Sequence, residues 1–417
     1  MAYEESYLLE LCAGAKKASY ALASLPTAVK DDLLEKIASA LEQNTDYLLK
    51  ENEKDLAAAD ENGLPKTMLD RLRLTEARIG GIASSLRELI RLADPIGSGK
   101  CIVRPNGLKI SHVRAPLGCV AIIYEARPNV TVDAAALCLK TGNAVILRGG
   151  KEAICSNKAL VSLMRGVLKE NGMDENAISL VERTEREYAN RLMTLREYVD
   201  VLIPRGGAGL IKSVVEAARV PVIETGAGNC HMYIEKDADM DMALKLSVSA
   251  KISRPSVCNS LEKLLVHEAI AKEFLPRFAE RAKAENVEIR GCEQVCAILP
   301  DALPMTEDDL WREYNDYIIG VKVVRDLEEA IAHINRYSTH HSEAIVTTSL
   351  ASADAFKKGI DSAAVYVNAS TRFTDGNVFG LGAEIGISTQ KLHARGPMGM
   401  YALTTDKFLI DGSGQIR

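Results

Sequence analysis

The 417-residue sequence contains no run of apolar residues that approaches the roughly 20 needed to cross a membrane, so no membrane contact is expected. Its first residues are acidic and lack a basic region followed by an apolar core, so no secretory signal is visible. The net charge of −6 argues against a nucleic-acid partner, because such a partner favours a basic surface. Internal repeats and low-complexity segments are also missing, so a repeat architecture is not expected.

Disulfide and metal frameworks are missing as well. The nine cysteines are odd in number and follow no framework spacing, which favours a reducing compartment, and we expect the cytoplasm. Cys292 and Cys296, or the adjacent His340 and His341, suggest a metal pair. Neither pair is accompanied by a second pair of ligands at the spacing of a structural zinc site, so no metal is expected.

The patterns that are present predict two domains, since 47% of the residues are hydrophobic and the chain is long for one core. Apolar residues recur every three or four positions through the first hundred residues, which predicts helices. Residues 101–113 alternate around Asn106-Gly107, a pattern typical of a β-hairpin. We interpret this hairpin as an oligomer contact, with an edge hairpin inside one subunit as the alternative.

Strand-like and helix-like segments alternate along the rest of the chain, which predicts an α/β fold with mostly parallel, helix-covered sheets. The expected strands are 119–124, 144–147, 199–203, 264–266, 318–324, 343–347 and 364–367, with another in the tail 401–417. The expected helices begin near residues 132, 153 and 209 and span 270–283 and 327–337.

Two expected strand-to-helix turns are rich in glycine, Arg148–Lys151 and Pro204–Gly209. Glycine lets backbone N–H groups approach a phosphate at a helix N-terminus, where the helix dipole favours an anion. Neither turn has the spacing of a dinucleotide fingerprint or a Walker A loop, and such turns also serve plain chain reversal.

Cys258 stands out among the cysteines. Most unpaired cysteines are small buried hydrophobic residues, and Cys119 and Cys138 fit that description because both lie in apolar runs. Cys258 is instead surrounded by Arg254, two serines and an asparagine. A carboxylate, Glu224, precedes it on a glycine-rich turn. This combination suits covalent acyl chemistry and predicts a cysteine nucleophile.

The sequence resembles the gamma-glutamyl phosphate reductases, also called glutamate-5-semialdehyde dehydrogenases, of the aldehyde dehydrogenase superfamily. The resemblance rests on motifs spread over the whole chain, at Tyr124–Thr131, Ile203–Gly209, Arg254–Asn259, Val367–Gly376, Phe379–Glu384 and Gln390–Pro397. It implies two Rossmann-like domains: a cofactor-binding domain (1–99 and 116–226) and a catalytic domain (227–399). Residues 100–115 and 400–417 would form an oligomerisation hairpin and tail.

The resemblance also implies a reaction, the NADPH-dependent reduction of L-glutamyl 5-phosphate to glutamate 5-semialdehyde in proline biosynthesis. Cys258 would form a thioester, and Asn129 with the backbone N–H of Cys258 would stabilise the oxyanion. Glu224 matches the superfamily's general base. Its role here would be thiol activation or the reverse reaction, since water must be excluded from the thioester.

The cofactor and substrate residues follow from the same resemblance. Arg148 and Lys151 would read the 2′-phosphate of NADPH. Glu313 would hold the nicotinamide ribose, or else be a solvated loop charge. The turn residues expected near the cofactor are Gly206, Gly207 and Gly209. The cationic residues expected to bind the substrate's anionic groups are Arg254, Arg372, His393 and Arg395.

Two other readings stay open at this point. A hydrolytic NAD(P)-dependent aldehyde dehydrogenase would share the fold, thiol and cofactor, and a catalytically silent nucleotide-binding scaffold would keep the glycine turns without a reactive thiol. Besides its small-molecule substrate, we expect a homo-oligomer and a transient contact with glutamate 5-kinase.

Overall fold

The computed structural model describes residues 3–125 and 127–417. The chain divides into two compact units, each described by itself. The first comprises Met1–Thr225, Gly380–Gly386 and Met398–Arg417, and the second comprises Gly226–Phe379 and Ile387–Pro397. No helix within the described ranges is long and apolar enough to span a membrane.

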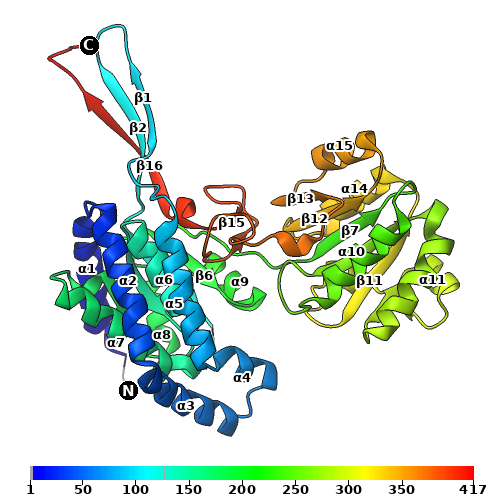
Figure 1. Ribbon diagram of the computed structural model, residues 1–417, viewed down its shortest axis with the longest axis horizontal. Coiled ribbons are helices and arrows are strands. Elements are labelled where there is room, and N and C mark those ends of the chain that lie inside the picture. Colours follow the sequence, from blue (N-terminus) through cyan, green and yellow to red (C-terminus); the bar gives the residue numbers. More distant parts are fainter. Residues whose placement is uncertain (1–2, 126) are drawn as a thin grey trace. The chain divides into compact units, whose positions relative to one another are not determined.

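The first unit opens with helices, as predicted (Figure 1). They are α1 (Glu5–Leu22), α2 (Thr27–Gln43), α3 (Thr45–Glu61), α4 (Lys66–Leu72) and α5 (Glu76–Arg91). In α5, the Thr75 hydroxyl accepts a hydrogen bond from the Arg78 N–H and so caps the first turn. Ile79, Ile82 and Leu86 then recur at helical spacing and are buried, which explains how α5 packs against the rest of the unit.

A parallel four-stranded sheet in the order β5–β4–β3–β6 forms the centre of this unit. Its strands are β3 (Cys119–Tyr124), β4 (Ala144–Arg148), β5 (Ile178–Leu180) and β6 (Val201–Arg205). The helices between and after them are α6 (Pro128–Lys140), α7 (Ile154–Glu170), α8 (Arg186–Leu192) and α9 (Ala208–Ala217). Helix α6 begins four residues before the expected position, because Pro128 fits the first turn of a helix.

A second, antiparallel sheet in the first unit joins distant parts of the chain. It consists of β1 (Gly99–Val103), β2 (Lys109–Pro116) and β16 (Thr404–Asp411), with β2 in the middle. The hairpin predicted around Asn106-Gly107 is confirmed, and Gly107 takes the positive φ of 87° that its turn requires. The side chains of Ile102, Val103 and Phe408 are exposed on this sheet.

The second unit contains a parallel seven-stranded sheet in the order β10–β9–β11–β8–β7–β12–β13. Its strands are β7 (Cys230–Ile234), β8 (Leu261–His267), β9 (Glu288–Gly291), β10 (Leu303–Pro304), β11 (Ile318–Val324), β12 (Ser342–Val346) and β13 (Ala364–Val367). Its helices are α10 (Met240–Ile252), α11 (Glu268–Ala284), α12 (Glu293–Ile298), α13 (Glu307–Trp311), α14 (Leu327–Tyr337) and α15 (Leu350–Gly359). A two-stranded ribbon of β14 (Ile387–Ser388) and β15 (Gly396–Pro397) completes the unit.

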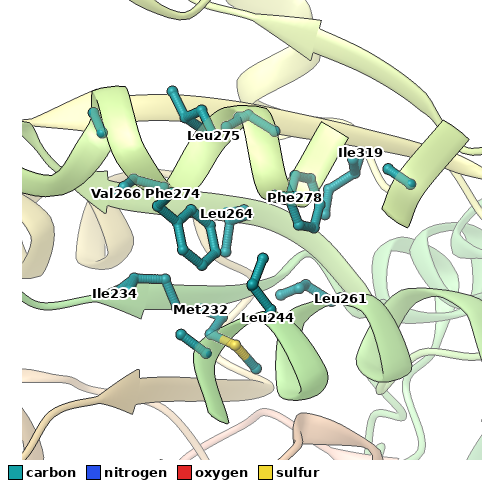
Figure 2. Packing of buried hydrophobic residues seen from close by; sticks show 14 of the residues in the cluster. Met232, Ile234, Leu244, Leu261, Leu264, Val266, Phe274, Leu275, Phe278 and Ile319 are labelled. Atoms are coloured by element: carbon teal, nitrogen blue, oxygen red, sulfur yellow. The ribbon is translucent and has the colours of Figure 1, made fainter. Parts of the chain in front are cut away.

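Two apolar clusters hold this sheet between its helices. Figure 2 shows the larger one, in which Leu264 and Val266 of β8 pack with Phe274 and Phe278 of α11. Leu265, which points to the other face of β8, packs with the residues of α14 instead. The predicted α/β fold with two helix-covered parallel sheets is therefore confirmed. The functional division of the chain into cofactor, catalytic and oligomerisation parts stays a prediction.

Candidate active site

Cys258 lies in a tight turn three residues before β8 and is partly buried. The Ser260 N–H donates to the Val257 carbonyl across this turn. The Asn259 side chain donates to the Thr374 carbonyl at 2.8 Å, and the Thr371 hydroxyl donates to the Asn259 carbonyl at 2.8 Å. The cysteine turn is thus tied to the segment 371–374, which lies more than a hundred residues later in the sequence.

Two arginines are electrostatically coupled to this turn. Burial lowers the pKa of Arg372, repulsion by Arg254 adds to that effect, and Cys258 opposes it. The Nε of Arg372 donates to the Ser253 hydroxyl at 3.0 Å, which fixes the guanidinium. A cation beside a cysteine favours the reactive thiolate, and two arginines together suit an anionic substrate group.

A glycine turn lies against the cysteine. A Cβ atom built on Gly228 would lie 1.4 Å from the carbonyl oxygen of Cys258, so only glycine fits at this position. The Gly228 N–H donates to Oε1 of Glu313 at 2.8 Å. In this structure Glu313 therefore has a partner inside its own unit, and its predicted contact with the nicotinamide ribose stays a prediction.

The buried cysteines behave as expected. Cys119 and Cys138 are fully buried, and burial raises the pKa of both thiols well above the ordinary value. Burial likewise raises the pKa of Cys230, whose Sγ donates to the carbonyl of Cys258 at 3.2 Å. These thiols are poor nucleophiles at neutral pH, in contrast to the partly exposed Cys258.

In the first unit, the end of β4 carries the residues predicted to read a 2′-phosphate. Arg148 donates to the Gly149 carbonyl at 2.8 Å and to the Thr184 carbonyl at 2.7 Å, and burial lowers its pKa. Its Nε is buried without a hydrogen-bond partner. Lys151 is exposed at the start of the following helical turn. The two cations therefore differ, because Arg148 holds the backbone while Lys151 faces solvent.

The other glycine turn, at the start of α9, holds an anion. The Gly207 N–H donates to Oε2 of Glu125 at 3.0 Å, and a Cβ atom on Gly206 would lie 2.7 Å from the Glu125 carboxyl carbon. A Cβ atom on Gly209 would meet nothing within 4 Å. A carboxylate of the same unit thus lies at this helix N-terminus, where the helix dipole favours negative charge. The predicted approach of a cofactor phosphate to this turn stays a prediction.

The remaining predicted residues are distributed over both units. Asn129, in the first turn of α6, donates to Asp133, whose pKa is raised to about 6 by burial. Glu224 also belongs to the first unit and is partly buried. Arg395, in the second unit, donates to the backbone carbonyl and the carboxylate of Asp361, both at 3.0 Å.

His393, also in the second unit, has a backbone φ of 67°. The catalytic, cofactor and substrate roles of all these residues stay predictions.

Known proteins share this architecture. The protein-family model described as "Aldehyde dehydrogenase family" matches residues 3–294 of this chain. The chain belongs to the aldehyde dehydrogenase family. The gamma-glutamyl phosphate reductase of Carboxydothermus hydrogenoformans is 58% identical over 411 residues, which cover 98% of this chain and 99% of that protein. At this level of identity the chain also belongs with the gamma-glutamyl phosphate reductases.

Two solved structures extend the comparison. The Thermotoga maritima gamma-glutamyl phosphate reductase superposes with a TM-score of 0.97 at 48% identity, over 98% of this chain and 99% of the other. The glyceraldehyde-3-phosphate dehydrogenase GapN of Methanocaldococcus jannaschii, solved in complex with NADP, has a TM-score of 0.69 at 18% identity and covers 99% of this chain and 96% of its own. The second likeness shows the fold alone.

A nicotinamide cofactor follows from membership of the aldehyde dehydrogenase family. The first unit fits such a group, because a glycine turn at the start of α9 seats an anion and Lys151 presents a cation to solvent. In the described ranges, no group of His, Cys, Asp or Glu has an arrangement that could hold a metal ion.

Sequence reasoning missed two residues next to the cysteine turn, Asn229 and Lys263. Both are buried, and they are hydrogen bonded to each other at 2.8 Å. The signal that could have identified Lys263 is the pair Glu262-Lys263 inside the otherwise apolar strand β8. A charged pair in a buried strand is costly unless hydrogen bonds satisfy it, so such a pair points to a built polar network.

Proposed function

We propose that this chain catalyses the NADPH-dependent reduction of L-glutamyl 5-phosphate to L-glutamate 5-semialdehyde, with release of phosphate, in proline biosynthesis. Identity of 58% to a gamma-glutamyl phosphate reductase over nearly the whole chain supports this reaction. The structural observation that carries the proposal is the turn of Cys258, which is coupled to two arginines and tied to the segment 371–374.

Cys258 acts as the nucleophile. Its thiolate attacks the acyl carbon of the substrate, the bond to the phosphate oxygen breaks, and phosphate leaves with that electron pair. The product of this step is a thioester, which accepts hydride readily because sulfur donates little into the carbonyl. The bound nicotinamide cofactor supplies the hydride. The tetrahedral adduct then collapses, so that the aldehyde forms and Cys258 is released as a thiolate.

Other residues support the two tetrahedral steps. Asn129 and the backbone N–H of Cys258 are assigned to the developing oxyanion, a type of contact whose loss costs about 10²-fold or more in rate. Glu224 is assigned to activation of the thiol or to the reverse reaction. Exclusion of water matters because hydrolysis of the thioester would release glutamate and waste the activated substrate.

The preference for NADPH rests on the cations that follow β4. Lys151 is assigned the direct contact with the 2′-phosphate because it is exposed. Arg148 contributes its charge and holds the loop through the carbonyls of Gly149 and Thr184. The glycines of the turn before α9 would hold the phosphates of the cofactor, and Glu313 would hold the nicotinamide ribose.

The substrate's anionic groups are assigned to four cationic residues of the second unit. Arg372 interacts electrostatically with both Arg254 and Cys258, which supports a role of these two arginines at the reacting end of the substrate. Arg395 and His393 are assigned more remote contacts, since Arg395 is already engaged by Asp361.

The proposal extends to the oligomeric state of the protein and to its location in the cell. The exposed apolar side chains of β1 and β16 support a homo-oligomer built through this sheet. We assign the enzyme to the cytoplasm, where a transient contact with glutamate 5-kinase would deliver the unstable acyl phosphate.

The reverse reaction tests the proposed function. The purified enzyme is mixed with glutamate 5-semialdehyde and NADP⁺, with and without inorganic phosphate, and formation of NADPH is followed by absorbance. We expect NADPH to form only when phosphate or arsenate is present, because an anion must accept the acyl group from Cys258. Equal rates without either anion would contradict the reductase and favour a hydrolytic aldehyde dehydrogenase.

A further inference from the structure

Lys263 is a buried lysine whose three N–H donors all have acceptors. It lies on β8 and is 2% exposed. Its Nζ donates to Oδ1 of Asn229 at 2.8 Å and to the carbonyl of Arg312 at 2.6 Å, and it lies 4.4 Å from the centre of the Tyr314 ring. Two oxygens and an aromatic face match the three donors of an ammonium group.

The surrounding sheet makes room for this side chain. Gly320 on β11 pairs with Lys263, and a Cβ atom on Gly320 would lie 2.7 Å from Cδ of the lysine. Burial lowers the pKa of Lys263 to about 7, an effect that the charge of Glu262 opposes. Burial of the Lys263 ammonium costs desolvation free energy, and its side chain fills the space beside Gly320. We therefore interpret the position of Lys263 as a fixed part of this polar network.

Lys263 donates hydrogen bonds to a residue next to Glu313 and to a residue next to Gly228, and Glu313 and Gly228 are themselves hydrogen bonded. Arg312, whose carbonyl accepts one bond, immediately precedes Glu313. Asn229, whose side chain accepts the other, immediately follows Gly228. The Gly228 N–H in turn donates to Glu313. The ammonium group of Lys263 therefore links the segment that carries Gly228 to the segment that carries Glu313.

Asn229 anchors its segment firmly. Its amide nitrogen donates to the Leu310 and Tyr337 carbonyls at 2.8 and 2.9 Å, and its backbone N–H donates to the Thr339 hydroxyl at 2.9 Å. With Lys263 on its Oδ1, both ends of the buried side chain are satisfied. Loss of the lysine would leave two buried oxygens, Oδ1 of Asn229 and the Arg312 carbonyl, without this donor.

We infer that Lys263 is a positioning residue for the nucleophile, which it orients through Asn229, Arg312 and the Glu313–Gly228 contact. Gly228 lies directly against the Cys258 carbonyl, so a shift of the glycine displaces the peptide that carries the thiol. A displaced Cys258 loses its coupling to the Arg372 cation, and its thiol becomes less reactive. The inference rests on the proposed role of Cys258 as nucleophile.

The test measures the thiol itself, without cofactor or substrate. Lys263→Met keeps the length of the side chain and removes its donors. The rate of Cys258 alkylation by iodoacetamide is measured on the full-length protein by mass spectrometry of the Cys258 peptide, which separates it from the other cysteines. We expect the rate to fall about tenfold, since displacements near 1 Å cost up to about 10²-fold at reacting centres. The kcat of the phosphate-dependent reaction should fall by a similar factor.

Lys140→Met is the matched control. Lys140 is equally buried and is hydrogen bonded to Asp31 and to the Ile90 carbonyl, but it belongs to the first unit. The Lys140→Met variant should have lower thermal stability than the wild type but the same rate of Cys258 alkylation. If Lys263→Met does not fold, Gly320→Ala is the second variant, because its Cβ atom displaces the lysine stem while the charge remains.

A double-mutant cycle separates positioning from general loosening. Glu313→Ala removes the acceptor of the Gly228 N–H and should also slow alkylation. Because both residues act through the same glycine, the double variant should be no slower than the slower single variant. Alkylation of folded Lys263→Met within twofold of wild type, or effects of the two substitutions that multiply, would overturn the inference. Neither outcome would affect the phosphate dependence that tests the proposed function.

Discussion

The two parallel-sheet units differ in how they treat buried charge. In the first unit, buried Lys30 forms an ion pair with Asp94, and buried Lys140 forms one with Asp31. In the second unit, the ammonium of Lys263 is held by an amide oxygen and a backbone carbonyl, with no carboxylate among these contacts. The second unit also contains a buried ion pair, between Lys251 and Glu262. Among these four buried lysines, Lys263 therefore differs in being held by a hydrogen-bond network beside the cysteine turn and not by an opposite charge.

The second unit contains several buried titratable groups whose pKa values are strongly shifted. Burial lowers the pKa of His231 to about 3 and that of His333 to about 2, and it raises the pKa of Glu343 to about 8. All three lie in the second unit. The first unit also contains a shifted group, Asp133, whose pKa is raised to about 6 by burial. Other charges of this unit lie at helix and strand ends, where Lys151 is exposed and the Glu125 carboxylate accepts a hydrogen bond at the start of α9. We therefore expect substitutions in the two units to separate chemistry from cofactor binding.

The largest expected effect follows from removing the nucleophile in the second unit. Cys258→Ala should lower kcat by more than about 100-fold, because binding and oxyanion stabilisation alone remain. The affinity for NADPH, measured by titration of its fluorescence, should stay nearly unchanged. A variant that retains more than about a hundredth of the wild-type kcat would refute the thioester route.

The next effect concerns the cations of the first unit. Lys151→Ala should raise the KM for NADPH by roughly tenfold or more and leave the KM for NADH almost unchanged, because only NADPH carries the additional phosphate. Arg148→Ala is the companion variant and should lower thermal stability as well, since it releases the Gly149 and Thr184 carbonyls. Equal losses for the two cofactors in Lys151→Ala would show that this residue does not recognise the 2′-phosphate.

A smaller effect is expected from the buried histidines of the second unit. Between pH 6.5 and the low folded-state pKa values, the unfolded chain binds protons that the folded chain excludes, so the free energy of unfolding falls as the pH falls. His333→Gln should reduce the stability lost between pH 7 and pH 5 by roughly 1 to 2 kcal/mol. Glu343 acts in the opposite direction, since its raised pKa makes its contribution decrease as the pH rises from about 4.5 to 8.

Urea unfolding at a series of pH values measures this dependence. His112→Gln is the control for loss of an imidazole outside the second unit, because His112 is exposed and belongs to the first unit. An unchanged slope in His333→Gln would mean that His333 accepts a proton in the folded state.

The smallest effect is expected at Glu125. Its carboxylate occupies the start of α9, where the phosphates of a nicotinamide cofactor are proposed to lie, so the two anions compete. Glu125→Gln removes the charge and should tighten NADPH binding by about threefold, as measured by calorimetry. Weaker binding in this variant would indicate that Glu125 helps to hold the cofactor.

Much of the fold could be predicted because hydrophobic period and turn residues act locally. The strand 318–324 and the helix 327–337 coincide with β11 and α14, and the hairpin formed around Asn106-Gly107. Strands with weaker patterns, such as β5 and β9, were missed because both are only three or four residues long. Helix α6 begins before the expected residue 132, because Pro128 favours the first turn of a helix and apolar periodicity does not reveal this preference.

The sequence by itself determined the α/β class, the glycine turns and the distinctive surroundings of Cys258, because each depends on residues that are neighbours in the chain. Only the tertiary structure decided which side chains are already engaged. Arg148 is held by the Thr184 carbonyl, Glu313 by the Gly228 N–H, and Lys263 by Asn229. Such pairs are set by strand order and by the loops between strands, which bring together groups that the local pattern treats as independent.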